Sequence, residues 1–412
     1  MVFPLFLPSI SIYFRYTQPL ISFLFFQQEK NDYLCIVIER IVYRQYPHML
    51  RDALRIILLM LLPVSMYGQE VQFVFPQHPM KQVKLLFVGD LMQHQAQIDA
   101  ARRPDGNYDY THCFSLVKER ITEADLAIGN LEVTLGGEPY RGYPQFSAPD
   151  EYLYALRDIG FDILGTANNH SLDRYRRGLE RTLMLIDSVG LKSLGTYRDA
   201  SDRSSRYPLL VEKNGIRIAF LCATYGTNGF TTTYPNIVNS LDREELAEDI
   251  RTAHTMGADA IIALVHWGNE YQQQPSAEQR NLSQWLIEQG VDHIIGSHPH
   301  VVQPIELVPY PDYPNHHVVA YSLGNYVSNM SIAHGDVGLT LELTLEKVGN
   351  ATRLKDFGHY FVWTERAALS EKADFRIVPE DTIPADLTPR GMQRLEWAIG
   401  MEKNFYDTIS TQ

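Results

Sequence analysis

The chain has 412 residues, of which 45% are hydrophobic and 21% charged, and its formal net charge is −13. A chain of this length and composition can bury a large core, so we do not expect an intrinsically disordered protein. The acidic balance and the lack of any Lys/Arg run exclude a general nucleic-acid binder, because such a protein must neutralise phosphates. An anionic ligand would have to be held locally, by a metal ion or by a few arginines.

Residues 1–68 differ from the rest and are predicted to be a leader. From Met49 onward, basic residues precede a short apolar core at 56–62, and a small residue, Gly68, follows, which is typical of a secretory signal peptide spanning 49–68. We therefore expect residues 1–48 to come from a misassigned start. Export to the periplasm or another part of the cell envelope is the expected localisation.

An alternative reading keeps residues 1–48 as part of the protein. The aromatic stretch at 19–26 would then be a membrane or targeting element. It lacks a continuous apolar run of membrane length, which favours the first interpretation.

Short apolar runs alternate with helical patterns after an extended spacer at 69–82. Strands are predicted at 83–89, 126–129, 161–166, 192–195, 216–224, 258–266, 291–296, 317–323 and 339–345, and helices at 114–122, 150–158, 174–189, 243–255 and 276–289. This rhythm predicts an α/β core occupying 69–349, in which ligands collect outside the carboxyl ends of the strands. Residues 350–412, with a strand at 359–364 and a helix at 390–406, are predicted to form an appended C-terminal region packed on this core.

Ligand-type side chains recur where predicted strands end. They are Asp90, Glu132, Asn169 with His170, His266, and His298 with His300. Each has an ordinary alternative, such as capping a turn for Asp90, a core histidine for His266 or a turn residue for Asn169. Their joint recurrence favours one shared site, and carboxylates, an amide and imidazoles suit a divalent cation such as Mn²⁺, Zn²⁺ or Fe²⁺.

Six short motifs carry a family resemblance. They are Gly89-Asp90, Asn130-Leu131-Glu132, Ala167-Asn168-Asn169-His170, His266-Trp267-Gly268, Gly296-Ser297-His298-Pro299-His300 and Tyr321-Ser322-Leu323-Gly324-Asn325. In this order, over roughly 83–329, they resemble the CapA family of capsule (poly-γ-glutamate) synthesis proteins. That family is similar in turn to the calcineurin-like metallophosphoesterases. The resemblance implies an α/β fold with a double β-sheet sandwich flanked by helices, and two metals at the strand ends.

The resemblance also implies roles for individual residues. Asn169, His266 and His298 match ligands of one metal, Asp90 and His300 match ligands of the other, and either Glu132 or Asn130 replaces a bridging aspartate. Position 92, where the phosphoesterases have a histidine ligand, is methionine, so one metal site is expected to be well made and the second to lack a hard ligand. His94 lies two residues further on, and we expect it to be a surface loop residue.

Two functional hypotheses remain open, and the sequence does not decide whether the protein is an enzyme. In the first, it is a metal-dependent, phosphoesterase-like hydrolase or transferase in which His170 protonates the leaving group. Asp173 either orients that imidazole or caps the following helix. Arg141, Arg174 and Asn130 are the expected substrate-binding residues.

In the second hypothesis the fold is a non-catalytic binding or scaffolding component of an envelope synthesis complex. Its partners would be an anionic envelope polymer such as poly-γ-glutamate, or the precursor of that polymer, together with membrane synthase components. Nucleic acid is not an expected partner, because the chain is acidic and offers no basic or aromatic platform.

Overall fold

The computed structural model describes residues 23–27, 33–38, 70–74, 81–310, 315–369 and 373–410. The chain divides into two compact units, Met1–Met80 and Lys81–Gln412. In the first unit, β1 (Phe23–Gln27) pairs antiparallel with β2 (Tyr33–Ile38), which pairs parallel with β3 (Glu70–Val74). The predicted start at Met49 and signal peptide at 49–68 lie outside the described residues. No helix among the described residues is long and apolar enough to cross a bilayer.

The second unit contains a sheet of eight strands in the order β19-β18-β17-β4-β5-β6-β7, with β16 paired to β4. The strands β4 to β7 and β16 are parallel, and β17 to β19 are antiparallel. Their bounds are β4 Lys81–Leu91, β5 Leu126–Leu131, β6 Ile163–Gly165, β7 Lys192–Leu194, β16 Asn325–Val327, β17 Val337–Val348, β18 Ala351–Glu365 and β19 Arg376–Pro379.

A second sheet has six strands in the order β14-β15-β13-β12-β10-β9, of which the four central ones are parallel. Their bounds are β9 Leu209–Lys213, β10 Ile216–Thr224, β12 Ala260–His266, β13 His293–Ser297, β14 Ile305–Pro309 and β15 His316–Ala320. A separate ribbon pairs β8 (Thr196–Tyr197) with β11 (Ile237–Val238).

Alternating side chains of β4 explain why the two sheets stack. Val83, Leu85 and Phe87 belong to the apolar cluster between the sheets, whereas Leu86 and Val88 belong to the cluster under the helices on the outer face. A largely apolar strand is typically buried on both faces, as β4 is from Leu85 onward. The apolar run at 83–89 therefore predicted a central strand correctly.

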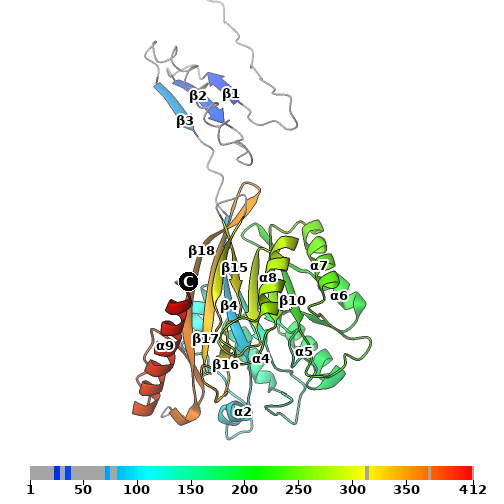
Figure 1. The fold of residues 1–412 in the computed structure, drawn as a ribbon, viewed down its shortest axis with the longest axis vertical. Helices are drawn as coiled ribbons and strands as arrows, with labels where there is room; N and C mark the ends of the chain where they lie inside the picture. Colours follow the sequence, from blue (N-terminus) through cyan, green and yellow to red (C-terminus); the bar gives the residue numbers. More distant parts are fainter. Residues whose placement is uncertain are drawn as a thin grey trace, which may run out of the picture. The chain divides into compact units, whose positions relative to one another are not determined.

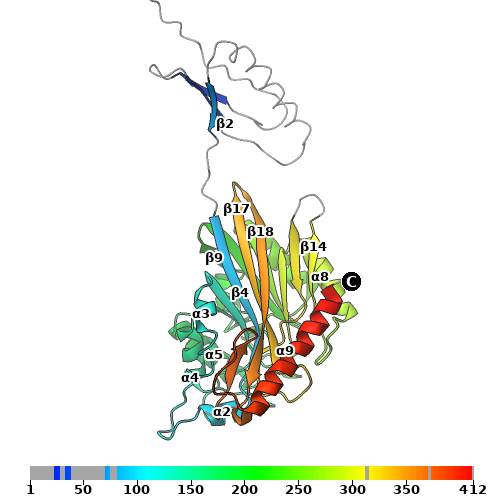
Figure 2. The ribbon, with the colours of Figure 1, turned by 90° about the vertical axis from the view of Figure 1, so that its left-hand side faces the viewer.

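Helices cover both outer faces (Figures 1 and 2). Residues of α3 (Lys118–Thr122), α4 (Asp150–Asp158) and α5 (Tyr175–Ser188) pack on the first sheet, and those of α7 (Arg243–Thr255) and α8 (Ala277–Gln289) pack on the second. Figure 2 shows α3, α4 and α5 on one side of the sheets and α8 on the other. The predicted double β-sheet sandwich flanked by helices is confirmed.

The C-terminal region differs from its prediction. The expected boundary at 349/350 falls in the turn of a long hairpin, in which β18 pairs with β17 along its whole length. Residues from 351 onward therefore extend the first sheet. Only the last helix, α9 (Pro389–Ser410), lies against the sandwich as an added element, beside β18 in Figure 1. The strand predicted at 359–364 is the second half of β18, whereas its polar first half, residues 351–358, is not buried and was not predicted as a strand.

Several shorter elements of the second unit were not predicted from the sequence. They include the helices α2 (Gln95–Ala101) and α6 (Ala200–Arg206), the edge strands β9, β14 and β19, and the short strands β8, β11 and β16. None of the α6 residues is buried, so no apolar stripe marks this helix.

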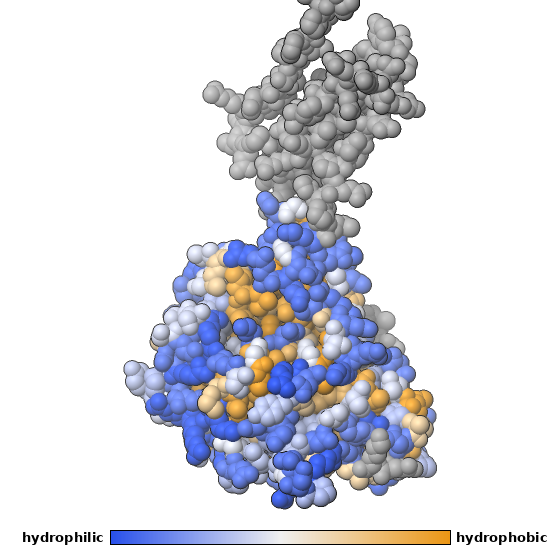
Figure 3. Space-filling view, turned by 180° about the vertical axis from the view of Figure 1, so that it is seen from behind, coloured by the Kyte–Doolittle hydropathy of each residue, from blue (hydrophilic) through white to orange (hydrophobic). Residues whose placement is uncertain are grey.

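The surface is mostly hydrophilic, with apolar side chains gathered in the middle of the face shown in Figure 3. Tyrosines are prominent among the exposed large side chains of the described residues. Two of them lie beside the predicted metal ligands: Tyr225 is 49% exposed and Tyr271 47%.

The close approach of β4 to the Gly324 backbone depends on Gly89. A Cβ atom at this position would lie 1.9 Å from the Gly324 carbonyl oxygen, which accepts a hydrogen bond from the Asp90 amide. We predict that Gly89→Ala lowers the free energy of unfolding by about 1–3 kcal/mol, because the backbones must separate. Denaturant unfolding tests this, with Gly226→Ala as the control, since a Cβ there has no neighbour within 4 Å. Equal losses in the two variants would contradict the packing argument.

Candidate metal centre

Five parallel strands from both sheets deliver the predicted ligands to one edge of the sandwich. Asp90 lies at the end of β4, Glu132 follows β5, Asn169 follows β6, His266 ends β12, and His298 and His300 follow β13. The exposed fraction of each of these side chains is 3% or less. The structure thus brings together the six residues that were predicted as metal ligands.

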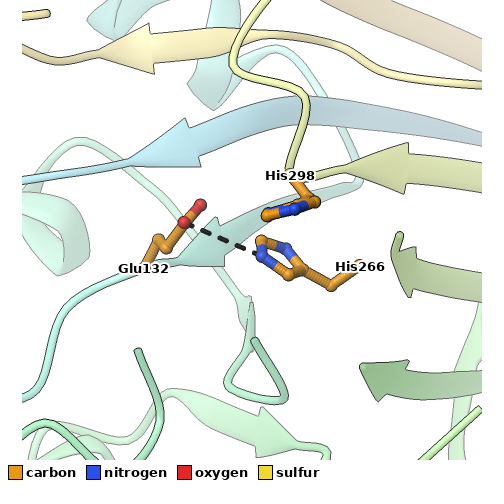
Figure 4. A group of neighbouring side chains, drawn as sticks. All are labelled: Glu132, His266 and His298. Atoms are coloured by element: carbon orange, nitrogen blue, oxygen red, sulfur yellow. Dashed lines mark ion pairs between the residues drawn. The ribbon is translucent and has the colours of Figure 1, made fainter. Parts of the chain in front are cut away.

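Glu132 lies at the middle of this group. Its Oε1 atom is 3.7 Å from His266 Nε2 and 3.6 Å from His300 Nε2, yet it has no hydrogen-bond partner. Figure 4 shows the carboxylate facing the His266 ring, with the His298 ring beside it. An unpartnered, fully buried carboxylate oxygen costs free energy, and a cation among these groups would remove that cost.

Asn130 forms hydrogen bonds with both acidic residues, Asp90 and Glu132. Its Nδ2 group donates to Asp90 Oδ1 at 2.8 Å and to Glu132 Oε2 at 3.1 Å. The sequence left open whether Glu132 or Asn130 takes the shared position. Because Glu132 faces the imidazoles and Asn130 holds the carboxylates, the geometry favours Glu132.

The ligand atoms form three overlapping groups, within each of which they lie within 4.8 Å of one another. The groups are Glu132 with His266 and His298, Asp90 with Glu132 and His300, and Glu270 with His298 and His300. Asn169 adds an amide oxygen to the first group, 2.8 Å from His266 Nε2. This set of carboxylate, amide and imidazole donors fits a divalent cation.

The electrostatics of the centre follow from its burial. Burial lowers the pKa of His266 well below its usual value and that of His298 to about 3, helped by the neighbouring imidazoles. Both rings are therefore neutral at physiological pH, the form that binds metals. Burial and the charge of Asp90 raise the pKa of Glu132, whereas Asp90 has a lowered pKa because its hydrogen bonds with His300 and Asn130 outweigh burial.

The backbone around the two neighbouring histidines is strained. His298 has φ 101° and His300 has φ 58°, both in the left-handed region that non-glycine residues rarely adopt. A Cβ atom at Gly296 would lie 2.0 Å from the Tyr321 carbonyl oxygen and 2.6 Å from the indole nitrogen of Trp267. Gly296 therefore allows a close approach to these groups, and this packing holds the histidine segment at the edge of the sheet.

His170 and Asp173 form a buried pair. His170 Nδ1 is 2.7 Å from Asp173 Oδ2, which also accepts a hydrogen bond from the Phe146 amide. Burial raises the pKa of Asp173, and the hydrogen bond with His170 partly offsets this rise. The helix α5 begins at Tyr175 with Arg174 as its N-cap, so of the two roles left open for Asp173, the geometry favours orienting the imidazole.

The predicted substrate-binding arginines lie in segments around this pair. Arg174 is half-buried, and its aliphatic stem packs on Gly136 and Gly178. Arg141 is exposed, and its backbone pairs with Ser147. Neither arginine belongs to the ligand groups, so their roles in binding substrate stay predictions.

Met92 and His94 do not complete the second ligand group. Met92 is fully buried in the apolar cluster between the first sheet and its helices. His94 lies in the loop before α2, as its N-cap, and is half-buried: it accepts a hydrogen bond from the Asn329 amide and packs edge-on against Phe146. Its burial lowers its pKa to about 4.

Sequence reasoning missed several residues that orient or extend the centre. The Ser297 hydroxyl is 2.9 Å from His266 Nδ1, and Asn325 Oδ1 is 3.0 Å from His300 Nδ1. Both stand in the quoted motifs, which could have indicated their role in fixing the imidazoles. Tyr225, whose ring centroid is 4.5 Å from that of His298, and Glu270 had no sequence signal.

Comparisons with known proteins agree with the motifs. The sequence model of the family described as "Bacterial capsule synthesis protein PGA_cap" matches residues 84–330. The capsule biosynthesis protein CapA of Bacillus anthracis is 26% identical over 60% of this chain and 60% of its own length, and the PGA biosynthesis protein CapA of Bacillus subtilis is 29% identical over 58% and 62%. The matches thus span about three fifths of the length of these relatives.

Solved structures with a similar backbone fold include phosphoesterases and nucleotidases. The calcineurin-like phosphoesterase YfkN of Bacillus subtilis has a TM-score of 0.40 and 15% identity, covering 79% of this chain and 98% of that one. The NAD nucleotidase of Haemophilus influenzae has a TM-score of 0.44 and 12% identity, covering 79% and 56%.

We predict that the substitution Glu132→Gln affects stability differently in the absence and in the presence of metal. In chelator, Glu132→Gln should unfold with a free energy equal to or above that of the wild type, because an amide replaces a carboxylate buried beside Asp90. With Mn²⁺ at about 100 times its Kd, the wild type should gain about 2.7 kcal/mol and the variant far less. Unfolding with and without Mn²⁺ measures both effects.

The control variant is His316→Ala, at an exposed position on β15. It should keep the full stabilisation by Mn²⁺. An equal gain in Glu132→Gln and the wild type would show that Glu132 is not a ligand.

Proposed function

The chain belongs to the family of bacterial capsule synthesis proteins, and from this premise we propose that its second unit is a metal-dependent hydrolase or transferase. Its substrate would be a phosphoester or a related anionic group used in making an envelope polymer. The family resemblance read from the sequence motifs is confirmed. The observation that carries the proposal is the unpartnered Glu132 Oε1 atom, buried between two imidazoles next to the His170–Asp173 pair.

The residues of the first ligand group are proposed to hold the cation. They are Glu132, Asn169, His266 and His298. A divalent ion such as Mn²⁺, Zn²⁺ or Fe²⁺ supplies Lewis acidity, which polarises an anionic substrate and lowers the pKa of water. Ser297 fixes the His266 ring through its 2.9 Å contact with Nδ1, so that Nε2 stays directed at Glu132 and Asn169.

We propose that His170 donates a proton to the leaving group. Its Nδ1 atom is engaged by Asp173, which leaves Nε2 as the atom that can hold or release a proton. Asp173 is held in turn by the Phe146 amide, and the Phe146 ring lies edge-on to the imidazole with 4.7 Å between ring centroids. The imidazole therefore has one fixed orientation, as a proton donor needs.

Donor groups around the centre support an anionic substrate. Tyr225 and Tyr271 lie 4.5 Å and 6.3 Å, between ring centroids, from His298 and His300, and both are about half exposed. Burial raises the pKa of each phenol to about 12, so both stay protonated and can donate hydrogen bonds. Arg141, Arg174 and Asn130 are proposed to contribute the remaining substrate contacts.

The cellular setting is part of the proposal. We place the protein outside the cytoplasm, in the periplasm or cell envelope, because residues 49–68 have the pattern of a signal peptide and the family acts in capsule synthesis. Its proposed partners are an anionic polymer such as poly-γ-glutamate, or its precursor, and membrane synthase components. The CapA relatives are named for capsule and PGA biosynthesis, which supports the polymer part of this proposal.

A second candidate function is supported by Met92. Because this side chain packs in the apolar cluster, the second ligand group has three residues, Asp90, Glu132 and His300. A centre that binds one ion would suit a polymer-binding or scaffolding component as well as an enzyme. Turnover by the metal-loaded protein distinguishes the two functions.

We predict that His170→Ala lowers turnover of a chromogenic phosphodiester by about 10²- to 10⁴-fold, the usual contribution of a general acid. Bound Mn²⁺ should be unchanged, because His170 belongs to no ligand group. Arg176→Ala is the control, since this exposed arginine is paired with Glu180. The full-length chain is assayed in Mn²⁺, with metal measured on the same samples.

Equal rates in His170→Ala and the wild type would remove His170 from the mechanism. A wild-type protein that binds Mn²⁺ but turns over neither a phosphodiester nor a phosphomonoester would favour the scaffolding function.

A further inference from the structure

The two buried ligand groups are unequal. The first has four protein donors, once the Asn169 oxygen joins Glu132, His266 and His298. The second has three, Asp90, Glu132 and His300, and Met92 adds none. Glu132 is common to both groups, so two cations could share it if the second position had a further donor.

Glu270 lies beside His300, which belongs to the second group, and beside His298, which belongs to the first. Its carboxylate and the ring nitrogens of His298 and His300 lie within 4.8 Å of one another. It is exposed, unlike both histidines, and it comes from the segment that joins β12 to α8. It therefore approaches the histidines from the side that solvent reaches.

The backbone of this segment holds Glu270 in place. Tyr271, the next residue, has φ 64°, and its amide donates to the Pro299 carbonyl oxygen at 2.8 Å. Because Pro299 stands between the two histidines, this hydrogen bond ties the Glu270 segment directly to them. A strained non-glycine residue beside a cluster of ligands is a frequent feature of functional sites.

A second backbone constraint lies on the other side of Glu270. Gly268 has φ 87°, and a Cβ atom there would lie 2.5 Å from the side chain of Gln279 in α8. Gln279 also contacts Gln303, which donates to the carbonyl of Gln272. Close packing at Gly268 and the hydrogen bond to Gln272 thus hold the segment on both sides of Glu270.

Charge makes this arrangement unfavourable without a cation. Glu270 adds a third carboxylate to a centre that already buries Asp90 and Glu132, and its charge opposes ionisation of Glu132. Among the described residues, no Lys or Arg forms an ion pair with Glu270. A divalent ion would turn these repulsions into attractions.

We propose that Glu270 is a protein ligand of a second cation bound at His300, the residue that the Glu270 group shares with the group of Asp90 and Glu132. Glu270 would thereby replace the donor that the chain lacks at position 92. This inference rests on the proposed function, and it adds that the centre is binuclear despite Met92. Because Glu270 is exposed and the ligands of the first ion are buried, the second ion should bind more weakly and exchange faster.

The test is a Mn²⁺ titration of the full-length protein, followed by electron paramagnetic resonance of the bound ions. The wild type should bind about two ions whose spins are coupled, as in two-metal sites with ions about 3.5–4 Å apart. In Glu270→Gln, the second ion should bind at least about 10-fold more weakly, as loss of even an outer contact can cause. The remaining ion should give the signal of isolated Mn²⁺.

The matched control is Glu278→Gln, an exposed glutamate at the start of α8. It should bind two coupled ions, as the wild type does. Glu270→Asp keeps a carboxylate and should recover part of the affinity for the second ion.

The outcomes separate this inference from the proposed function. Two coupled ions in Glu270→Gln with wild-type affinity would overturn the role of Glu270 and leave the metal centre standing. A single ion in the wild type would also overturn it. No bound ion in the wild type would overturn the metal-dependent function itself.

Discussion

The arrangement depends on the burial of two neighbouring carboxylates, Asp90 and Glu132, at an edge where the imidazoles of His266, His298 and His300 lie beside them. Burial keeps His266 and His298 neutral, so they cannot balance the acids by taking up protons. Asp90 is satisfied by hydrogen bonds, but Glu132 keeps one oxygen without a partner. A cation at this edge would balance the charge of both carboxylates and give the unpartnered Glu132 oxygen a partner.

The sandwich makes this convergence possible. Parallel strands of both sheets end at one edge, so side chains from segments as distant as β4 and β13 meet there. Two glycines bring the backbones close enough: Gly89 against Gly324, and Gly296 against Tyr321. The ligands are then fixed by neighbours such as Asn130, Ser297 and Asn325, which leave little freedom to rearrange. The fold therefore presents a pre-organised set of donors.

Sequence reasoning succeeded where one local signal was strong. The apolar run of β10 and the amphipathic helices α4 and α7 were predicted with their observed bounds. The six residues predicted as metal ligands were recognised because they follow buried strands, and the structure brings them together. The mistakes concern contacts between distant segments: the boundary expected at 349/350 separates β17 from β18, although the two strands pair along their whole length. Glu270 was missed because its place beside the histidines depends on such contacts, among them the hydrogen bond from the Tyr271 amide to Pro299.

The most direct test of the account is to locate Mn²⁺ by anomalous X-ray scattering in crystals of the full-length protein. The account predicts a strong peak between Glu132, His266 and His298. It also predicts a weaker peak between Asp90, Glu132 and His300, about 3.5–4 Å from the first. A fully occupied Mn²⁺ site elsewhere, with no anomalous density beside Glu132, would contradict the claim that the buried carboxylates are there to hold a cation.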